Sequence, residues 1–316
     1  MIRRNFILGA GAGFAAACAP VRGRVPATDA ETSHPPLGRF YGPPGRRVHA
    51  TDQGEGRPVV LIHGASGNLR DWTFSIAPLL AESYRVIAMD RPGFGYSDRQ
   101  DHSNAWRPES QAMQLRVAAL EMGVENPIIV GHSWGAAVAL AWALDAPDQV
   151  AGVVSVSGMT MPWDGIAPFL DAIGVGPLLA GAYSRRMVRT AESGGAAQFI
   201  DRAFSPQTPP EGYFDYVGVP LALRPATVAA NADDLAYAQR AVTALSARYA
   251  GLRVPVEVMH GGSDRLLDFT QHGLYFAASV PDASFLPLAQ TGHMAHHVHP
   301  EALAELIGAI AARTPA

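Results

Sequence analysis

Short apolar runs rich in β-branched residues alternate with helical patterns along most of the chain. A run that is apolar throughout predicts a strand buried on both faces of a sheet, and helical segments between such runs predict parallel strands. The runs are Pro58–Gly64, Tyr84–Asp90, Asn126–Gly131, Ala151–Gly158, Val254–Asp264 and Ala283–His293. This alternation predicts an α/β fold with a mostly parallel, doubly wound sheet and helices on both faces.

The alternation stops between residues 160 and 249, where helical patterns and a proline-rich loop replace the buried strands. A helical insertion between two halves of one sheet predicts a cap. We therefore expect a core in two parts, residues 39–159 and 250–316, with the cap at 160–249. Within the core, helices are expected over Asp71–Ser83, Pro108–Met122, Trp134–Asp145, from about Asp268, and over Pro300–Ala312, with an edge strand at Arg46–Gly54.

The N-terminus has the pattern of an export signal. Arg3 and Arg4 precede an apolar segment from Phe6 to Ala17, which is short for a membrane span. The paired arginines resemble a twin-arginine signal, and an ordinary Sec signal is the alternative. Residues 1–18 are therefore expected to direct export.

Cys18 is the only cysteine of the chain and follows three alanines at the end of this segment. The arrangement resembles a bacterial lipoprotein box, although Ala15 stands where leucine is usual. Residues 19–38, rich in proline, threonine and serine, predict a tether. The protein is then expected to be exported and held on a membrane by a lipid at Cys18, facing the periplasm or the cell exterior. Simple cleavage and secretion is the alternative.

Composition limits the partners. Hydrophobic residues make up 48% of the chain and charged residues 16%, which favours a large core over disorder. The net charge is −4 and no long basic run occurs, so nucleic acid is not an expected partner. We expect a small, apolar substrate and no cofactor. The oligomeric state is left open.

The sequence IIVGHSWGAA places Ser133 between a buried strand and an alanine-rich helix. A sharp strand-to-helix turn exposes the serine side chain, and the crowding explains Gly131 and Gly135 two residues to either side. A serine hydroxyl in this position is a candidate nucleophile that needs a base beside it. The less specific alternative is a buried capping serine.

The expected base is His293, which ends the strand Ala283–His293. His296, His297 and His299 are rivals near the start of the last helix. The segment HMAHHVH also allows a metal site, but no acidic residue lies at the spacing of a zinc protease, and no metal is expected.

The expected orienting carboxylate is Asp264, which follows the preceding strand and would hold the imidazole in one tautomer. Asp268 is a rival that also fits a helix cap, and Asp164 is a second rival. Two backbone N–H groups are needed for the oxyanion. The expected donors are Trp134, after the nucleophile, and Ala65, in the loop after Pro58–Gly64.

The segments HGASG, DRPGFGYSD, GHSWG, HGGSD and TGH resemble the α/β-hydrolase superfamily, in the branch of esterases, haloperoxidase-like proteins, carbon–carbon bond hydrolases and epoxide hydrolases. The resemblance extends from about Tyr41 to the C-terminus and is weakest in the cap. It implies the order Ser133, Asp264, His293. Because epoxide hydrolases and dehalogenases of this branch carry aspartate at the position of Ser133, it also implies acyl transfer to serine.

The motifs and the resemblance are compatible with three functions. The first is hydrolysis of a carboxylic ester or lactone; the second is carbon–carbon bond hydrolysis; the third is a non-catalytic binding protein of the same fold. The complete Ser133–Asp264–His293 set favours an enzyme. Trp163 and Phe214, in the cap, are expected to line the substrate pocket, although packing of the cap onto the core would also explain them.

Overall fold

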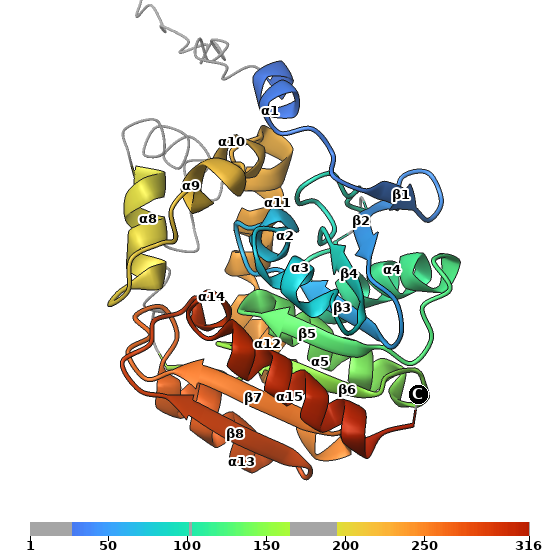
Figure 1. Ribbon diagram of the computed structural model, residues 1–316, viewed down its shortest axis with the longest axis vertical. Helices are drawn as coiled ribbons and strands as arrows, with labels where there is room; N and C mark the ends of the chain where they lie inside the picture. The colour runs from blue at the N-terminus through green and yellow to red at the C-terminus, as the bar shows by residue number, and fades with distance from the viewer. Residues whose placement is uncertain (1–26, 101–102, 165–194, 316) are drawn as a thin grey trace, which may run out of the picture.

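The computed structural model describes residues 27–100, 103–164 and 195–315. Its centre is an eight-stranded sheet with the order β1-β2-β4-β3-β5-β6-β7-β8 (Figure 1). The strands are β1 (Arg39–Tyr41), β2 (Val48–Gln53), β3 (Pro58–Ile62), β4 (Arg85–Met89), β5 (Ile128–His132), β6 (Gly152–Val156), β7 (Val256–Gly261) and β8 (Ala283–Leu288).

Six of these strands form one parallel run, from β4 through β3, β5, β6 and β7 to β8. β2 pairs antiparallel with β4, and β1 pairs antiparallel with β2. The sheet is therefore mostly parallel, which confirms the expected α/β class. β5 lies between β3 and β6, so the residue that follows it, Ser133, lies near the middle of the sheet.

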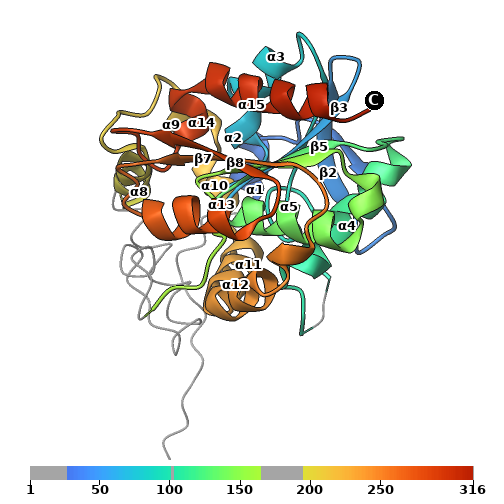
Figure 2. The same cartoon turned by 90° about the horizontal axis from the view of Figure 1, so that it is seen from below.

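Helices cover both faces of the sheet (Figure 2). On one face lie α2 (Arg70–Thr73), α3 (Ile76–Leu80) and α15 (Pro300–Arg313), whose buried side chains include Trp72 and Ile307. On the other lie α4 (Pro108–Glu121) and α5 (Trp134–Asp145). α5 is almost entirely apolar and buried, because it lies between the sheet and other helices.

Several elements differ from the sequence prediction. The helix expected over Asp71–Ser83 is divided into α2 and α3, because Ser75 has φ −148°, outside the helical region. The helix expected from Asp268 is a π-helical segment, Thr270–Tyr275, followed by α13 (Phe276–Ser279). A short helix, α14 (Ala295–Val298), precedes α15, and β1 was not expected.

The described helices between β6 and β7 form the expected cap region. They are α8 (Gly195–Phe204), α9 (Tyr213–Tyr216), α10 (Val219–Ala222), α11 (Pro225–Ala236) and α12 (Ala238–Ser246). Residues 165–194 of the expected cap lie outside the described residues.

The expected tether over residues 19–38 is corrected for its second half. Ala27–Ser33 forms helix α1, which contacts α10, and the Ala30 side chain is buried. A ring nitrogen of His34 bonds to the carbonyl oxygen of Asp215 at 2.8 Å, and Arg70 donates to the carbonyl of Pro35. Composition indicated a tether because these contacts with distant segments leave no local pattern. Cys18 lies outside the described residues.

Among the helices of the described ranges, none combines the length and the hydropathy needed to cross a bilayer.

Candidate active site

Ser133 occupies a sharp turn between β5 and α5. Its backbone angles are φ 53° and ψ −119°, in the left-handed half of conformational space that non-glycine residues rarely adopt. Such a conformation costs about 1–3 kcal/mol and persists only where the surrounding structure imposes it. Here the Ser133 N–H donates to Val156 and its carbonyl accepts from Met159 N–H, so hydrogen bonds to β6 and the segment after it support the turn.

The glycines around Ser133 are needed because backbone segments approach closely. A Cβ atom added to Gly131 would lie 2.4 Å from the carbonyl oxygen of Gly135, and one added to Gly135 would lie 2.3 Å from that of Ile62. Any side chain at these two positions would therefore displace α5 from β3 and β5. A Cβ on Gly64 would lie 3.0 Å from Ser133 Cβ, which places the loop after β3 directly beside the serine.

His293 and Asp264 form a close pair at the ends of β8 and β7. Nδ1 of His293 lies 2.7 Å from Oδ2 of Asp264, and both side chains are buried. Because the carboxylate accepts from Nδ1–H, Nε2 of His293 is left with a free lone pair, as a general base requires.

Asp264 is satisfied on both oxygens. The backbone N–H groups of Leu266 and Leu267 donate to Oδ1, and Nε2 of His260 lies 3.2 Å from Oδ2. Burial alone would raise the pKa of Asp264, but His293 and His260 hold the pKa below its ordinary value. The carboxylate is therefore ionised at neutral pH.

The segment that carries His293 also contacts the cap. The His293 N–H donates to the carbonyl of Ala203 at 2.9 Å, at the end of α8. The side chain of Gln207 accepts from Gly292 N–H and donates to the Gln290 carbonyl. The position of this segment therefore depends on the cap as well as on β8.

The rival residues lie elsewhere. His296 and His297 both point to Asp71, and His299 lies 2.8 Å from the Thr291 hydroxyl. Oδ1 of Asp268 accepts from Gln271 N–H in the first turn of the following helix, and Asp164 is exposed. None of these five residues contacts the His293 ring among the described contacts.

Asp71, His296 and His297 are the one group of described residues whose ligand atoms lie close enough to share a metal ion, within 4.8 Å of one another. Imidazole and carboxylate suit a transition metal. However, a His296 ring bound to metal through Nε2 would carry a proton on Nδ1, and buried Nδ1 has no hydrogen-bond partner in the described structure. The group therefore fits a hydrogen-bonded cluster better than a metal site.

The two expected oxyanion donors belong to segments next to the serine. Trp134 is the first residue of α5, where backbone N–H groups have no partner within the helix. Ala65 follows Gly64 in the loop beside Ser133. The next residue, Ser66, has φ 58°, and its N–H donates to Asn231 on α11. The cap thus supports the loop that contains Ala65.

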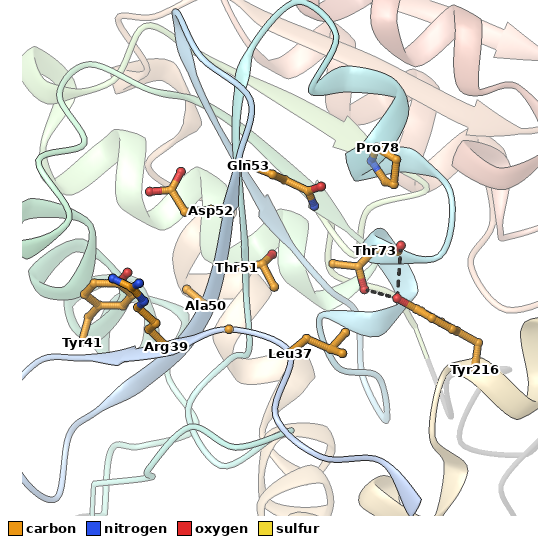
Figure 3. Close-up of a pocket in the computed structure, with 11 residues that line it drawn as sticks. Leu37, Arg39, Tyr41, Ala50, Thr51, Asp52, Gln53, Thr73, Pro78 and Tyr216 are labelled. Atoms are coloured by element: carbon orange, nitrogen blue, oxygen red, sulfur yellow. Dashed lines mark hydrogen bonds between the residues drawn. The ribbon is translucent and has the colours of Figure 1, made fainter.

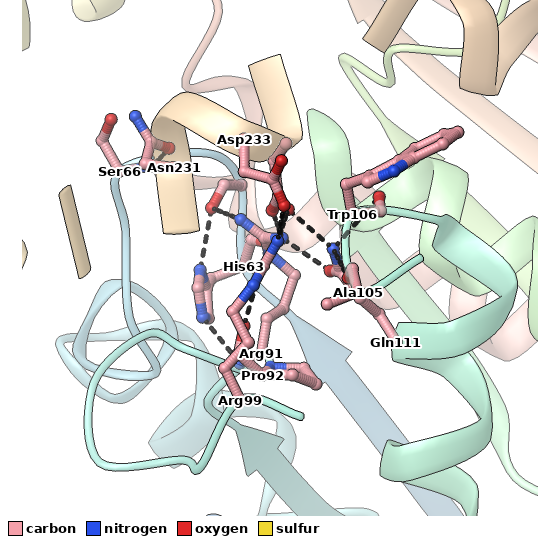
Figure 4. Close-up of polar contacts among 12 residues, drawn as sticks. His63, Ser66, Arg91, Pro92, Arg99, Ala105, Trp106, Gln111, Asn231 and Asp233 are labelled. Carbon is pink, nitrogen blue, oxygen red and sulfur yellow. Dashed lines mark hydrogen bonds and ion pairs between the residues drawn. The ribbon is translucent and has the colours of Figure 1, made fainter. Parts of the chain in front are cut away.

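A buried ion pair joins this same loop to the cap (Figure 4). Arg91 and Asp234 are both fully buried, and their closest side-chain atoms lie 2.8 Å apart. Arg91 also donates to the carbonyls of His63 and Gly64 and to the Gln111 side chain. Burial lowers the pKa of Arg91 to about 10, which leaves it charged at neutral pH.

The two expected pocket residues have different environments. Trp163 is half-buried, with its ring 6.1 Å from that of His272. Phe214 is 41% exposed, whereas its neighbour Tyr213 is buried. The inward position of α9 therefore belongs to Tyr213.

A separate groove of about 710 Å³ lies on the outer side of β2 and is lined by residues of β1, β2, α2, α3 and α9 (Figure 3). Ser133, Asp264 and His293 are not among its lining residues. It is therefore distinct from the candidate active site.

Sequence reasoning did not identify Asp71, His260, Arg91 or Asp234. For Asp71, the only indication in the sequence was the histidine pair in HMAHHVH. Asp71 lies 225 residues away from His296 in the chain. No local spacing could have found it.

Comparison with known proteins agrees with the observed fold. The family model described as alpha/beta hydrolase fold matches residues 57–300. A 2-hydroxymuconate semialdehyde hydrolase of Pseudomonas sp. is 29% identical over 299 residues, which are 89% of this chain and 95% of that relative. Epoxide hydrolase B of Mycobacterium tuberculosis is 36% identical over 118 residues, 36% of this chain and 33% of that relative. The solved structure of an alpha/beta hydrolase fold protein from Burkholderia ambifaria has a TM-score of 0.71 and 24% identity, covering 86% of this chain and 97% of that one.

Proposed function

The chain belongs to the α/β-hydrolase family, and from this premise we propose that it is a serine hydrolase that cleaves a carboxylic ester or a lactone. The observation that carries the proposal is the backbone of Ser133, at φ 53° and ψ −119°, together with a His293 ring whose Nδ1 is held by Asp264. A strained strand-to-helix turn of this kind is the conformation in which this fold presents a nucleophilic serine, and it supports that role for Ser133.

The proposed reaction has two stages. Nε2 of His293 takes the Ser133 proton while Oγ bonds to the substrate carbonyl carbon, and the imidazolium then protonates the departing alkoxide. This leaves an acyl-enzyme and releases the alcohol. Water then attacks the acyl carbon, again with His293 as base, and Ser133 regains its proton as the acid leaves. Asp264 keeps His293 in one tautomer and stabilises its cationic form.

The negative oxygen of each tetrahedral intermediate needs two donors. In this proposal they are the backbone N–H groups of Trp134 and Ala65. Trp134 begins α5, whose N-terminal dipole favours negative charge there. Ala65 lies in the loop that Asn231 and Arg91 support.

The nucleophile favours an ester over an epoxide, because an alkyl-enzyme intermediate in this branch uses aspartate. Among the described residues, the arginine buried beside this loop is not available to bind a substrate carboxylate. Arg91 is buried beside the loop, but its guanidinium donors already bind Asp234, Gln111 and two carbonyls. It has no pair of donors left to bind a substrate carboxylate.

A carbon–carbon bond hydrolase is the second candidate. The observation in its favour is that the 2-hydroxymuconate semialdehyde hydrolase matches this chain over nearly its whole length. The same Ser133 and His293 would act, with a ketone carbonyl in place of an ester.

A substrate panel tests both candidates. Wild type and Ser133→Ala are assayed with p-nitrophenyl esters of graded acyl length, with lactones, and with a dienone that has a carbon–carbon bond to cleave. We expect wild type to hydrolyse a short or medium ester and Ser133→Ala to have no turnover. Phenylmethylsulfonyl fluoride should modify Ser133. Cleavage of the dienone alone would favour the second candidate, and turnover by Ser133→Ala would overturn both.

We also propose that the protein is exported and anchored through a lipid on Cys18. The supporting pattern is the arginine pair, the apolar segment and the lone cysteine after three alanines. The two or three acyl chains of a bacterial lipoprotein would give stable membrane attachment.

A further inference from the structure

Asp71 binds donors from two segments that lie far from it in the sequence. Its Oδ1 accepts from the Tyr213 hydroxyl and from Nε2 of His297, both at 2.8 Å. Its Oδ2 accepts from Nε2 of His296 at 3.2 Å. Tyr213 belongs to the cap helix α9, His296 and His297 to α14, and Asp71 to α2. One carboxylate therefore joins the cap to the segment that follows His293.

The cluster is buried and contains no arginine. Asp71 is 6% exposed, and its ion-pair partners among the described residues are histidines only. Burial lowers the pKa of His296 to about 4, so this ring is neutral at neutral pH. Although burial alone would raise the pKa of Asp71, His296 and His297 hold it well below its usual value. The carboxylate is thus a buried anion that depends on its donors.

His132 connects this cluster to the candidate active site. Its ring lies between those of His293 and His296, with centroids 4.7 Å and 4.5 Å away. Its Nε2 donates to the His293 carbonyl at 3.2 Å, and its Nδ1 lies 3.9 Å from Oδ2 of Asp71. His132 also precedes Ser133. Through His132 the cluster is therefore linked to the backbone of Ser133, which follows it, and to the backbone carbonyl of His293.

Tyr213 is buried in a group of aromatic rings that also covers His297. Its ring lies 5.0 Å from His297 and 5.1 Å from Phe204, which ends α8. The Phe204 ring in turn lies 5.7 Å from His297. If α9 moved away from the core, His297 would lose its contact with Tyr213, and Asp71 would lose a donor at once.

We propose that Asp71 is a positioning residue that couples the seated cap to the position of His293. When the Tyr213 hydroxyl is bound, the carboxylate keeps both histidines of α14 in place, and α14 fixes the backbone that carries His293. The inference rests on the proposed role of His293 as the base. It assigns Asp71 no contact with substrate.

The test compares Tyr213→Phe with Tyr216→Phe. Both tyrosines lie on α9 and both hydroxyls bond to α2, but Tyr216 bonds to Thr73 and not to Asp71 (Figure 3). Backbone amide hydrogen exchange is measured in α9 and α14, together with the rate at which phenylmethylsulfonyl fluoride modifies Ser133. This reagent is small, so its rate reports the Ser133–His293 geometry and not the filling of a long acyl pocket.

We expect Tyr213→Phe to raise exchange in α14 by about tenfold or more, as for the loss of one hydrogen bond to a charged group, and to slow Ser133 modification. For a short ester, kcat should fall more than KM rises. Tyr216→Phe should leave α14 exchange and the modification rate at their wild-type values. Asp71→Asn should exceed the effect of Tyr213→Phe, and the milder Tyr213→Phe decides the question if Asp71→Asn does not fold.

The coupling would be overturned if α14 exchanged at the wild-type rate in Tyr213→Phe. Equal effects of Tyr213→Phe and Tyr216→Phe on exchange in α14 would also overturn it. One equivalent of bound metal in the purified protein would overturn it as well, because Nε2 of the histidines would then bind metal. Hydrogen exchange does not use catalysis. It therefore decides the coupling even if wild type hydrolyses no ester and the proposed function fails.

Discussion

The Nδ1 atom of His293 and the Oδ2 atom of Asp264 lie 2.7 Å apart, although 29 residues separate them in the chain. The pairing follows from the sheet, because β7 and β8 are parallel neighbours and each residue comes shortly after its strand. Since backbone N–H groups and His260 satisfy the remaining positions on Asp264, its orientation is fixed.

Asp264→Asn should lower kcat on an ester by a factor on the order of 10⁴, because an amide cannot hold the His293 tautomer with a free Nε2. Asp268→Asn is the matched control. Its carboxylate accepts from Gln271 N–H in a helical turn, so its loss should affect stability slightly and turnover little. A larger loss of kcat in Asp268→Asn or Asp164→Asn would mean that the acid is misassigned.

Trp163→Ala should change the acyl-length preference more than it changes the melting temperature. The half-buried Trp163 contacts the core near His272, at the point where the chain leaves β6 for the cap. Phe214→Ala should have the smaller effect because that side chain is 41% exposed. The measurement is kcat/KM over a series of p-nitrophenyl esters. An unchanged profile in Trp163→Ala would exclude this residue from the pocket.

Asp234→Ala should destabilise the protein by about 3–5 kcal/mol, because it leaves the buried Arg91 charge without its partner. Asp233→Ala provides the control. The Asp233 side chain is 41% exposed and its ion-pair partner among the described residues is Arg99, so its removal should cost less than about 1 kcal/mol. Urea unfolding of both variants measures the difference. Similar values for the two would show that the buried pair adds no stability.

Stability should fall as the pH is lowered from about 6.5 toward 4. Burial, followed by the nearby Arg91 charge, lowers the pKa of His63 to about 4. Its Nε2 must stay unprotonated to accept from the Arg91 N–H. The unfolded chain takes up this proton first, so folding is favoured above pH 6.5 and loses on the order of 3 kcal/mol from His63 by pH 4.

His272 acts in the same direction, since burial lowers its pKa to about 4 and Nδ1 accepts from Thr160 and Met161 N–H groups. Thermal unfolding measured at steps of pH checks the prediction. A melting temperature that stays constant between pH 7 and pH 4.5 would contradict it.

Cys18→Ser should release the full-length protein from the membrane fraction of the host that expresses it. The expected cause is the loss of acyl chains, each buried methylene of which contributes about 0.8 kcal/mol. Intact mass of the wild-type mature chain should show the added acyl groups on Cys18. A mature wild type that begins at an unmodified Cys18 or Ala19 would indicate simple secretion.

The strands and the long helices were predictable because their signals are local. A strand buried on both faces, such as β3 or β5, is a continuous apolar run, and α5 is a continuous alanine-rich segment. β1 is too short for any period to appear, and helical periodicity does not register the break at Ser75. Helix α1 was missed because its support comes from the cap, nearly two hundred residues away in the chain.

The same distinction separates the parts of the candidate site. Ser133 and its glycines form one short motif, and Asp264 and His293 each follow a strand closely. Asp71 and Asp234 are different, because their partners His296 and Arg91 lie 225 and 143 residues away. An isolated aspartate in a sequence does not indicate which distant group it meets, so only the folded structure identifies these two.

The Arg91–Asp234 pair also limits how this protein could exchange parts with its relatives. A chimera that replaced α11 with a helix lacking an acid at the position of Asp234 would leave an arginine charge enclosed beside the loop that carries Ala65. Caps could therefore be recombined only together with a matching change at Arg91. Inheritance of the two residues would be linked, even though one belongs to the core of the fold and the other to the cap.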